Sequence, residues 1–465
     1  MLANYTGAAL LSASLTLTAC GGGAGSGTSA ILASGYPAAP VSCDTTAQRN
    51  WLRDYMFDQY FWYDRQGTPN ASATTMSGYL DSLLYTTLDR YSYAQSTAQF
   101  AQFFAEGRRT GYGYSLAWAD AASTILKVRL VEPLSPVGLA GLLRGDTIVS
   151  IDGFNAEQIA GGALASVSTE GVARVFVVAN ALGIQRSLNV NSADYPLTPV
   201  INASVMTASN GAKVGYLAYQ EFISTSATAL GNAVNSFRAA GVSEVILDLR
   251  YNGGGSSSVA RNLASMLGGV ALNGQVFASY RFNAKLSASD FSQTFTSSTA
   301  TLPAAPLAGI NRLLVISSGS TASASEMVIN GLRPYMSVIT VGSTSYGKPY
   351  AFIPRDACET TYSAVNLQIV NANNFGDYAS GIAATCPMSD DLTRQLGDKN
   401  ELRTAAALSY ISNGFCPPIA SVLEEKKAFT LMDNAPTAPK FIADGVALGE
   451  DGKPLARPRG VQISP

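Results

Sequence analysis

The sequence predicts a multidomain α/β protein, and three observations support this fold class. The 465 residues are enough for about three domains of ordinary size. Between residues 196 and 417, apolar strand-like runs alternate with segments of helical spacing, which favours a buried α/β core. Residues 107–195 contain short strand-like runs separated by Gly and Pro, whereas residues 44–106 have helical patterning.

The composition excludes several kinds of site and partner. The chain has no histidine, which rules out a Ser-His-Asp triad, a Cys-His pair and every His-ligated metal site. The 30 Lys and Arg residues nearly balance the 32 Asp and Glu residues, so the net charge is −2 and nucleic acid is not an expected partner. If the protein is a hydrolase, another side chain must therefore act as the base.

The N-terminus has the pattern of an export signal. Residues 7–19 form an apolar run that is too short to span a bilayer but has the length of a signal-peptide core. The run ends in Leu17-Thr18-Ala19-Cys20, which resembles the lipobox of bacterial lipoproteins, although no Lys or Arg precedes it. The resemblance implies a signal peptide over residues 1–20 and a lipid anchor at Cys20. The alternative is a signal peptide cleaved elsewhere, with Cys20 incidental.

Residue 22 is Gly rather than Asp, so resemblance to lipoprotein sorting rules favours the outer membrane, with the protein at the periplasmic face of a bacterial envelope. The Gly-, Ala- and Ser-rich residues 21–43 are predicted to be a flexible linker. Residues 44–106 are predicted to form a small helical domain, because aromatic and aliphatic residues recur near helical spacing in residues 44–64 and 76–89.

Residues 107–195 contain three predicted strands, in TILKVRLV, DTIVSIDG and ARVFVVAN. The loop Gly111-Tyr112-Gly113-Tyr114 and the later runs SPVGLA, LRGDTI and IDG resemble a PDZ domain of the bacterial protease type. The resemblance implies a PDZ-like domain whose Gly-rich loop binds the C-terminal segment of a polypeptide through backbone N–H groups. The alternative is an ordinary β-rich domain with glycines at its turns.

Two segments of the α/β region could carry catalytic side chains. Residues 317–326 follow a buried strand and open a helix, so a hydroxyl there would lie beside N–H groups that favour an oxyanion, although capping serines are far more common. Lys348 follows the apolar strand 337–342. A lysine can replace histidine as a base if it is neutral, and removal from water lowers the pKa of an amine.

A third segment, residues 248–255, ends in three glycines directly after a predicted strand. Glycines allow unusual backbone angles and expose N–H groups, which suits a donor to an oxyanion. No GK[ST] follows, so we discount a nucleotide-binding loop. The first residues of the segment, Asp248 and Arg250, can pair with each other or brace the loop.

These three segments, in this order, resemble the S41 family of serine peptidases, the C-terminal processing or tail-specific proteases. The resemblance implies an S41 peptidase core over residues 196–417, with Ser323 as the nucleophile and Lys348, 25 residues later, as the general base. It implies oxyanion donation by the N–H groups of Gly254 and Ala324, polypeptide substrates, and no metal or cofactor.

The chain departs from the family pattern after the lysine. Many members have a Gln four residues later that orients it, whereas Pro349 and Phe352 stand here. The sequence does not show which residue orients the Lys348 side chain in place of that Gln. Two alternatives therefore remain: a catalytically inactive peptide- or ligand-binding envelope lipoprotein on the same fold, and a PDZ-based scaffold.

Four cysteines remain after Cys20, and an even number in an exported chain predicts two disulfides with three possible pairings. We favour Cys358–Cys386, which would close a local loop, and Cys43–Cys416, which would tie the start of the folded region to its end. We do not expect these cysteines to bind zinc or act in catalysis. Residues 418–465 are predicted to be an extended or partly disordered tail.

Overall fold

A computed structural model confirms the mixed α/β fold class. It describes residues 39–120, 123–308 and 310–418, and the backbone of residues 461–462. The predicted signal peptide, Cys20, most of the predicted linker and most of the predicted C-terminal tail lie outside the described residues. Among the described helices, none is long and apolar enough to cross a membrane.

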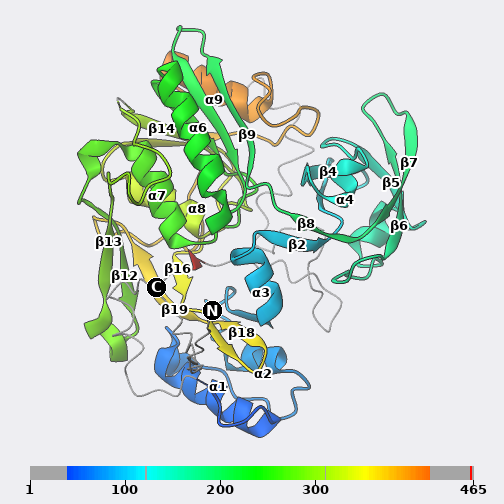
Figure 1. Cartoon of the computed structure of the whole chain (residues 1–465), viewed down its shortest axis with the longest axis vertical. Helices are drawn as coiled ribbons and strands as arrows, with labels where there is room; N and C mark the ends of the chain where they lie inside the picture. Colours follow the sequence, from blue (N-terminus) through cyan, green and yellow to red (C-terminus); the bar gives the residue numbers. More distant parts are fainter. Residues whose placement is uncertain (1–38, 121–122, 309, 419–460, 463–465) are drawn as a thin grey trace, which may run out of the picture. The chain divides into compact units, whose positions relative to one another are not determined.

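The N-terminal part contains α1 (Thr45–Gln59), α2 (Met76–Leu83) and α3 (Thr97–Phe104), with a short 3-10 turn at Tyr63–Arg65. α1 begins where the Asp44 side chain accepts from two N–H groups of the first turn. The segment also contributes β1 (Tyr93–Ser96), which pairs antiparallel with β18 (Thr360–Ser363), and β17 (Arg355–Ala357) completes that sheet. The helical segment is thus joined to later parts of the chain by a shared sheet (Figure 1).

The region predicted to be PDZ-like contains a five-stranded antiparallel sheet. Its strands, in spatial order, are β3 (Tyr114–Trp118), β4 (Leu126–Val131), β5 (Thr147–Ile151), β6 (Ala173–Ala179) and β7 (Gln185–Asn191). The short helices α4 (Pro136–Leu139) and α5 (Ala156–Ala160) pack with this sheet. β2 (Arg108–Gly111), which precedes the sheet in the sequence, pairs with β8 (Ala193–Pro196), which follows it. The three strands predicted here therefore form, as β4, β5 and β6.

The α/β core is built on a six-stranded sheet. Its strands, in spatial order, are β20 (Cys386–Pro387), β15 (Ser337–Gly342), β14 (Arg312–Ser317), β11 (Glu244–Asp248), β10 (Lys213–Tyr219) and β9 (Val200–Thr207). All neighbours are parallel except β9, which runs antiparallel to β10. The continuous apolar runs predicted as strands over residues 312–317 and 337–342 have these same bounds as β14 and β15.

Helices cover both faces of this sheet (Figure 1). α9 (Leu402–Asn413) packs its Ala406, Ala407 and Ile411 into a cluster with Tyr216 of β10. Gly215 points to the opposite face, because neighbouring strand residues alternate, and a Cβ there would lie 2.8 Å from the Phe237 ring of α6 (Ala227–Ala240). α7 (Ser257–Gly268) and α8 (Ala324–Leu332) complete the helical layers.

The residues that follow Lys348 belong to a second five-stranded sheet. Its strands, in spatial order, are β13 (Phe291–Thr294), β12 (Val276–Phe282), β19 (Val365–Val370), β16 (Tyr350–Phe352) and β21 (Val461–Gln462). Because β16 begins two residues after Lys348, the sheet fixes the chain on the C-terminal side of that lysine. Short 3-10 turns occur at Ser224–Ser226, Val270–Leu272 and Ala284–Ser289.

The predicted cysteine pairing is wrong. The disulfides are Cys43–Cys358 and Cys386–Cys416, with Cα–Cα distances of 5.5 and 5.4 Å. The reason is strand pairing. Cys358 lies in the turn between β17 and β18, which the β1–β18 pair brings to the start of α1, whereas Cys386 opens β20 on another sheet.

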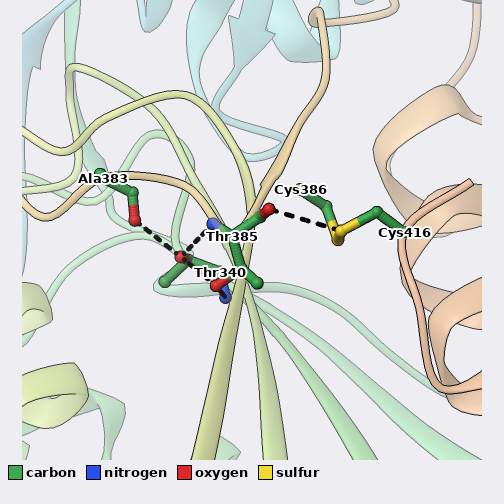
Figure 2. The surroundings of a disulfide bond; sticks show 5 residues. All are labelled: Thr340, Ala383, Thr385, Cys386 and Cys416. Atoms are coloured by element: carbon green, nitrogen blue, oxygen red, sulfur yellow. Dashed lines mark hydrogen bonds between the residues drawn. A yellow bond between two sulfur atoms is a disulfide. The ribbon is translucent and has the colours of Figure 1, made fainter. Parts of the chain in front are cut away.

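The Cys386–Cys416 bridge joins the edge of the six-stranded sheet to the segment after α9 (Figure 2). Beside it, the Thr340 hydroxyl of β15 donates to the Ala383 carbonyl, and the Thr385 N–H donates to that hydroxyl. These hydrogen bonds hold the segment that enters β20 against β15.

Candidate active site

The three segments singled out in the sequence leave the same edge of the parallel sheet. β11 ends at Asp248 and leads into the glycines, β14 ends at Ser317 and leads to Ser323, and β15 ends at Gly342 and leads to Lys348. Neighbouring parallel strands place the loops after their carboxyl ends side by side, where α/β proteins commonly bind ligands. The sheet order thus brings these segments into one neighbourhood.

Ser323 is the residue that precedes α8, and its backbone is strained. Its φ is +60° and its ψ is −113°, in a region that residues other than Gly rarely occupy. The side chain is buried, and its Oγ faces the Glu326 N–H as in a capping box but makes no close hydrogen bond among the described residues. A strained backbone and an unsatisfied buried hydroxyl are both typical of a functional residue.

Gly254 packs directly against the start of α8. Its φ is +109°, and a Cβ there would lie 2.8 Å from the Ser323 Cβ and 3.1 Å from the Ala324 nitrogen. Ala324 is the first residue of α8, so its N–H has no partner within the helix. The Gly254 N–H donates to Asn252 Oδ1 at 2.8 Å, so this predicted oxyanion donor is engaged in the structure.

Glu326 binds the backbones of both predicted catalytic residues. Its Oε2 accepts from the Ser323 N–H and the Lys348 N–H, each at 2.8 Å. Its Oε1 accepts from the Gly347 N–H at 2.6 Å and from the Ser345 hydroxyl. Burial raises the pKa of Glu326, while these hydrogen bonds oppose the rise. One carboxyl group therefore joins the start of α8 to the Lys348 loop.

Lys348 is fully buried among aromatic rings. Its Nζ lies 3.6 Å from the centre of the Phe352 ring and 5.5 Å from that of Tyr91. The Tyr91 hydroxyl donates to the Gly347 carbonyl at 2.6 Å. The sequence marks Phe352 only as a departure from the family pattern. It gives no signal for Tyr91, which local spacing does not distinguish from the aromatic core of the helical segment.

Arg250 braces the glycine-rich loop through a buried ionic network. It pairs with Asp248, as the sequence allows, but also with Glu401 at 2.7 Å and Asp390 at 2.9 Å. Burial would raise the pKa of Glu401, but the positive charge of Arg250 lowers it to about 2. Arg144, in the LRGD run of the β-rich region, also pairs with Asp390, at 2.8 Å.

We expect this network to make the protein sensitive to acid. The pKa of Glu401 is about 2 in the folded chain and its reference value is 4.5, so its contribution to stability is complete above about pH 4.5 and is lost as the pH falls towards 2. Glu401→Gln should lower the free energy of unfolding by about 3 kcal/mol at pH 7 and flatten its decline with acid. Urea unfolding from pH 7 to 3 measures both, with exposed Glu157→Gln as the control. An unchanged pH slope in Glu401→Gln would contradict the assignment.

The predicted peptide-binding loop lies between β2 and β3. Tyr112 and Tyr114 are buried, with ring centres 5.9 and 5.2 Å from that of Phe176. The Gly113 carbonyl accepts from the Glu132 N–H at 2.8 Å, which holds the loop against the segment before α4. With Gly111 at the end of β2, the loop belongs to the core of the β-rich region.

The β-rich region contacts the segment that leads to Ser323. Arg129 of β4 donates to the Ser320 hydroxyl at 3.1 Å and lies 4.5 Å from the centre of the Tyr251 ring. Arg144 donates to the Tyr251 hydroxyl. These contacts join residues far apart in sequence, and no motif signalled them.

Comparison with known proteins supports an S41 peptidase domain. Residues 213–370, which include all four predicted catalytic and oxyanion residues, match the model of Peptidase family S41. The carboxyl-terminal-processing protease of Picosynechococcus is 26% identical over 228 residues, which is 48% of this chain and 51% of that protein. The chloroplastic carboxyl-terminal-processing peptidase 1 of Arabidopsis thaliana is 25% identical over 300 residues, 61% of this chain and 56% of the relative. The chain thus spans about half the length of these curated relatives.

A solved structure extends the likeness beyond the matched domain. The crystal structure of a putative S41 protease from Bacteroides fragilis superposes with a TM-score of 0.63 and 25% sequence identity. The match covers 78% of this chain and 97% of that one. It supports the arrangement of an α/β core with accompanying regions.

Proposed function

We propose that the protein is a serine endopeptidase of the C-terminal processing type that works through a Ser323–Lys348 dyad. The observation that carries the proposal is the state of Ser323, a buried and unsatisfied hydroxyl on a strained turn. Glu326 holds that turn and the Lys348 backbone together. The match to an S41 domain over residues 213–370 supports the same assignment.

The reaction needs only groups of this chain and water. Ser323 Oγ attacks the peptide carbonyl carbon while the neutral Lys348 amine takes the hydroxyl proton. The Ala324 N–H stabilises the oxyanion, and the Gly254 N–H can join it by exchanging Asn252 Oδ1 for the oxyanion. The ammonium then protonates the leaving amine as the C–N bond breaks. Water hydrolyses the acyl-enzyme, with Lys348 again taking the proton.

The substrate and the location are further parts of the proposal. Unfolded or tail-tagged polypeptides would bind by their C-terminal segments to the PDZ-like region, at the loop Gly111–Tyr114. All four residues of this loop are buried in the structure, so peptide binding there requires the loop to open. The names of the relatives, carboxyl-terminal-processing proteases, support this substrate class. The lipobox-like sequence supports export and a lipid anchor at Cys20, on the periplasmic face of the outer membrane.

The test is cleavage of an unfolded protein with an apolar C-terminal sequence by the full chain. Ser323→Ala is compared with Ser187→Ala, a change at an exposed serine of β7. We expect both the wild type and Ser187→Ala to cleave and to react with a fluorophosphonate probe, and Ser323→Ala to do neither. Cleavage by the Ser323→Ala variant would show that Ser323 is not the nucleophile. A wild type that neither cleaves nor reacts would favour the alternative of a binding protein on the same fold.

A further inference from the structure

The side chain of Lys348 lies against two aromatic ring faces from different parts of the chain. The Phe352 ring comes from β16, with its centre 3.6 Å from Nζ, and the Tyr91 ring comes from the segment before β1, at 5.5 Å. A cation within about 6 Å of a ring centre is attracted by the negative face of the ring. Phe352 stands where the family pattern has an amide side chain, yet it has no group that can hydrogen bond.

The segment that supplies Tyr91 also fixes the main chain beside Lys348. The Tyr91 hydroxyl donates to the Gly347 carbonyl at 2.6 Å, and Arg90 donates to the Tyr346 carbonyl at 2.7 Å. The Arg90 guanidinium also lies 4.2 Å from the centre of the Tyr346 ring. On the other side, a Cβ at Gly347 would lie 2.3 Å from the Ala379 carbonyl oxygen, so the loop is closely packed against that residue.

We propose that Phe352 and Tyr91 are the positioning residues of Lys348, and that their ring faces hold its amine and stabilise its protonated form. The inference rests on the proposed function, in which Lys348 is the general base. A ring face attracts the ammonium without accepting a strong hydrogen bond. The proton taken from Ser323 is therefore stabilised on Lys348 and stays available for transfer to the leaving amine.

Other ionisable groups surround this site, and the test must leave them in place. They are Glu326 on α8, Arg90 and Tyr91 before β1, Tyr350 on β16, and Tyr378. Burial raises the pKa of Tyr91, Tyr350 and Tyr378, that of Tyr350 to about 12, so these phenols are neutral at neutral pH. A change confined to Phe352 therefore alters the ring without removing a charge.

The test is the titration of the Lys348 amine, followed by the ¹⁵Nζ resonance in the full chain and assigned with Lys348→Arg. Phe352→Leu keeps an apolar side chain but removes the ring, so we expect its midpoint to fall by about half a unit to one unit. Phe352→Tyr keeps the ring and should keep the wild-type midpoint. Phe57→Leu is the matched control, since it removes a ring 3.2 Å from Nζ of a different lysine, Lys285.

Cleavage gives a second readout. In Phe352→Leu, the acidic limb of the kcat/KM profile should move to lower pH with the midpoint, and kcat should fall about tenfold at little change in KM. A Phe352→Leu chain with the wild-type midpoint and the wild-type pH profile would overturn the inference. A merely structural role would lower stability without moving the midpoint, and that result would overturn it as well.

The two proposals can fail separately. If the wild type cleaves nothing, the proposed function fails, but the Lys348 titration still tests the contact with the rings. If Phe352→Leu does not fold, Tyr91→Leu and Tyr91→Phe replace it, because the second retains the ring and loses only the hydrogen bond to Gly347. A midpoint lowered in Tyr91→Leu and unchanged in Tyr91→Phe would support the inference, and equal midpoints in both would overturn it.

Discussion

Replacing Lys348 by Arg removes peptide cleavage, with an expected loss in kcat/KM of about a thousandfold or more. Arginine keeps the positive charge but is not deprotonated in proteins, so it cannot take the proton of Ser323. The Lys348 side chain is also fully buried, so the larger guanidinium must fit among the aromatic rings that surround it. Steady-state cleavage of the same unfolded substrate measures the effect.

Lys348→Met is the companion variant, because it fits an apolar site and carries no charge. We expect it to fold, as judged by thermal unfolding, and to lack activity as completely as Lys348→Arg. It separates loss of the base from damage to the fold. Substantial activity in Lys348→Met would contradict the dyad, because this variant has no amine at position 348 to take the proton of Ser323.

Gly254→Ala should also lower the activity strongly. The added Cβ would lie 2.8 Å from the Ser323 Cβ and 3.0 Å from the Ala322 carbonyl oxygen, so the nucleophile or the loop must move. We expect a fall in kcat/KM of about 100-fold or more, because displacements near 1 Å at a catalytic group have effects of this size. Cleavage assays and thermal unfolding together measure it.

The control for this prediction is Gly211→Ala. Gly211 also has a positive φ, +85°, but a Cβ there would meet no atom within 4 Å. This variant carries the backbone cost of about 1 kcal/mol without the steric clash, so it should lose stability and keep its activity. Equal activity in the two variants would show that Gly254 does not constrain Ser323.

The regular elements of the core could be predicted because each is encoded locally. The strand at residues 312–317 is a continuous apolar run, and the helix that follows it has its own spacing and small capping residues. The resemblance to the S41 family linked the three loops, and in the structure they follow neighbouring strands of one parallel sheet. The S41 match over residues 213–370 covers this predictable part of the chain.

The contacts that complete the site depend on distant parts of the chain. Tyr91 reaches the Lys348 loop across more than 250 residues, and in the sequence it is one aromatic residue among many. The disulfides depend on tertiary packing: the β17–β18 hairpin lies beside the start of α1, and the edge strand β20 lies beside the segment after α9. The number of cysteines carries no information about these contacts. The positive φ of Ser323 also leaves no trace in the residue types, because serine is an ordinary helix cap.

The shared sheet of β1 and β18 limits how the chain could be recombined. A fragment lacking residues 44–106 would keep Ser323, Lys348 and Gly254 but lose Arg90, Tyr91 and the strand that pairs with β18. The Cys43–Cys358 bridge adds a covalent link across the same junction. The helical segment therefore cannot be exchanged independently of the core. Replacing residues 44–106 with the equivalent segment of another protein would also replace residues that contact the Lys348 loop. Substitutions in this segment and in the core must therefore be compatible with each other during evolution.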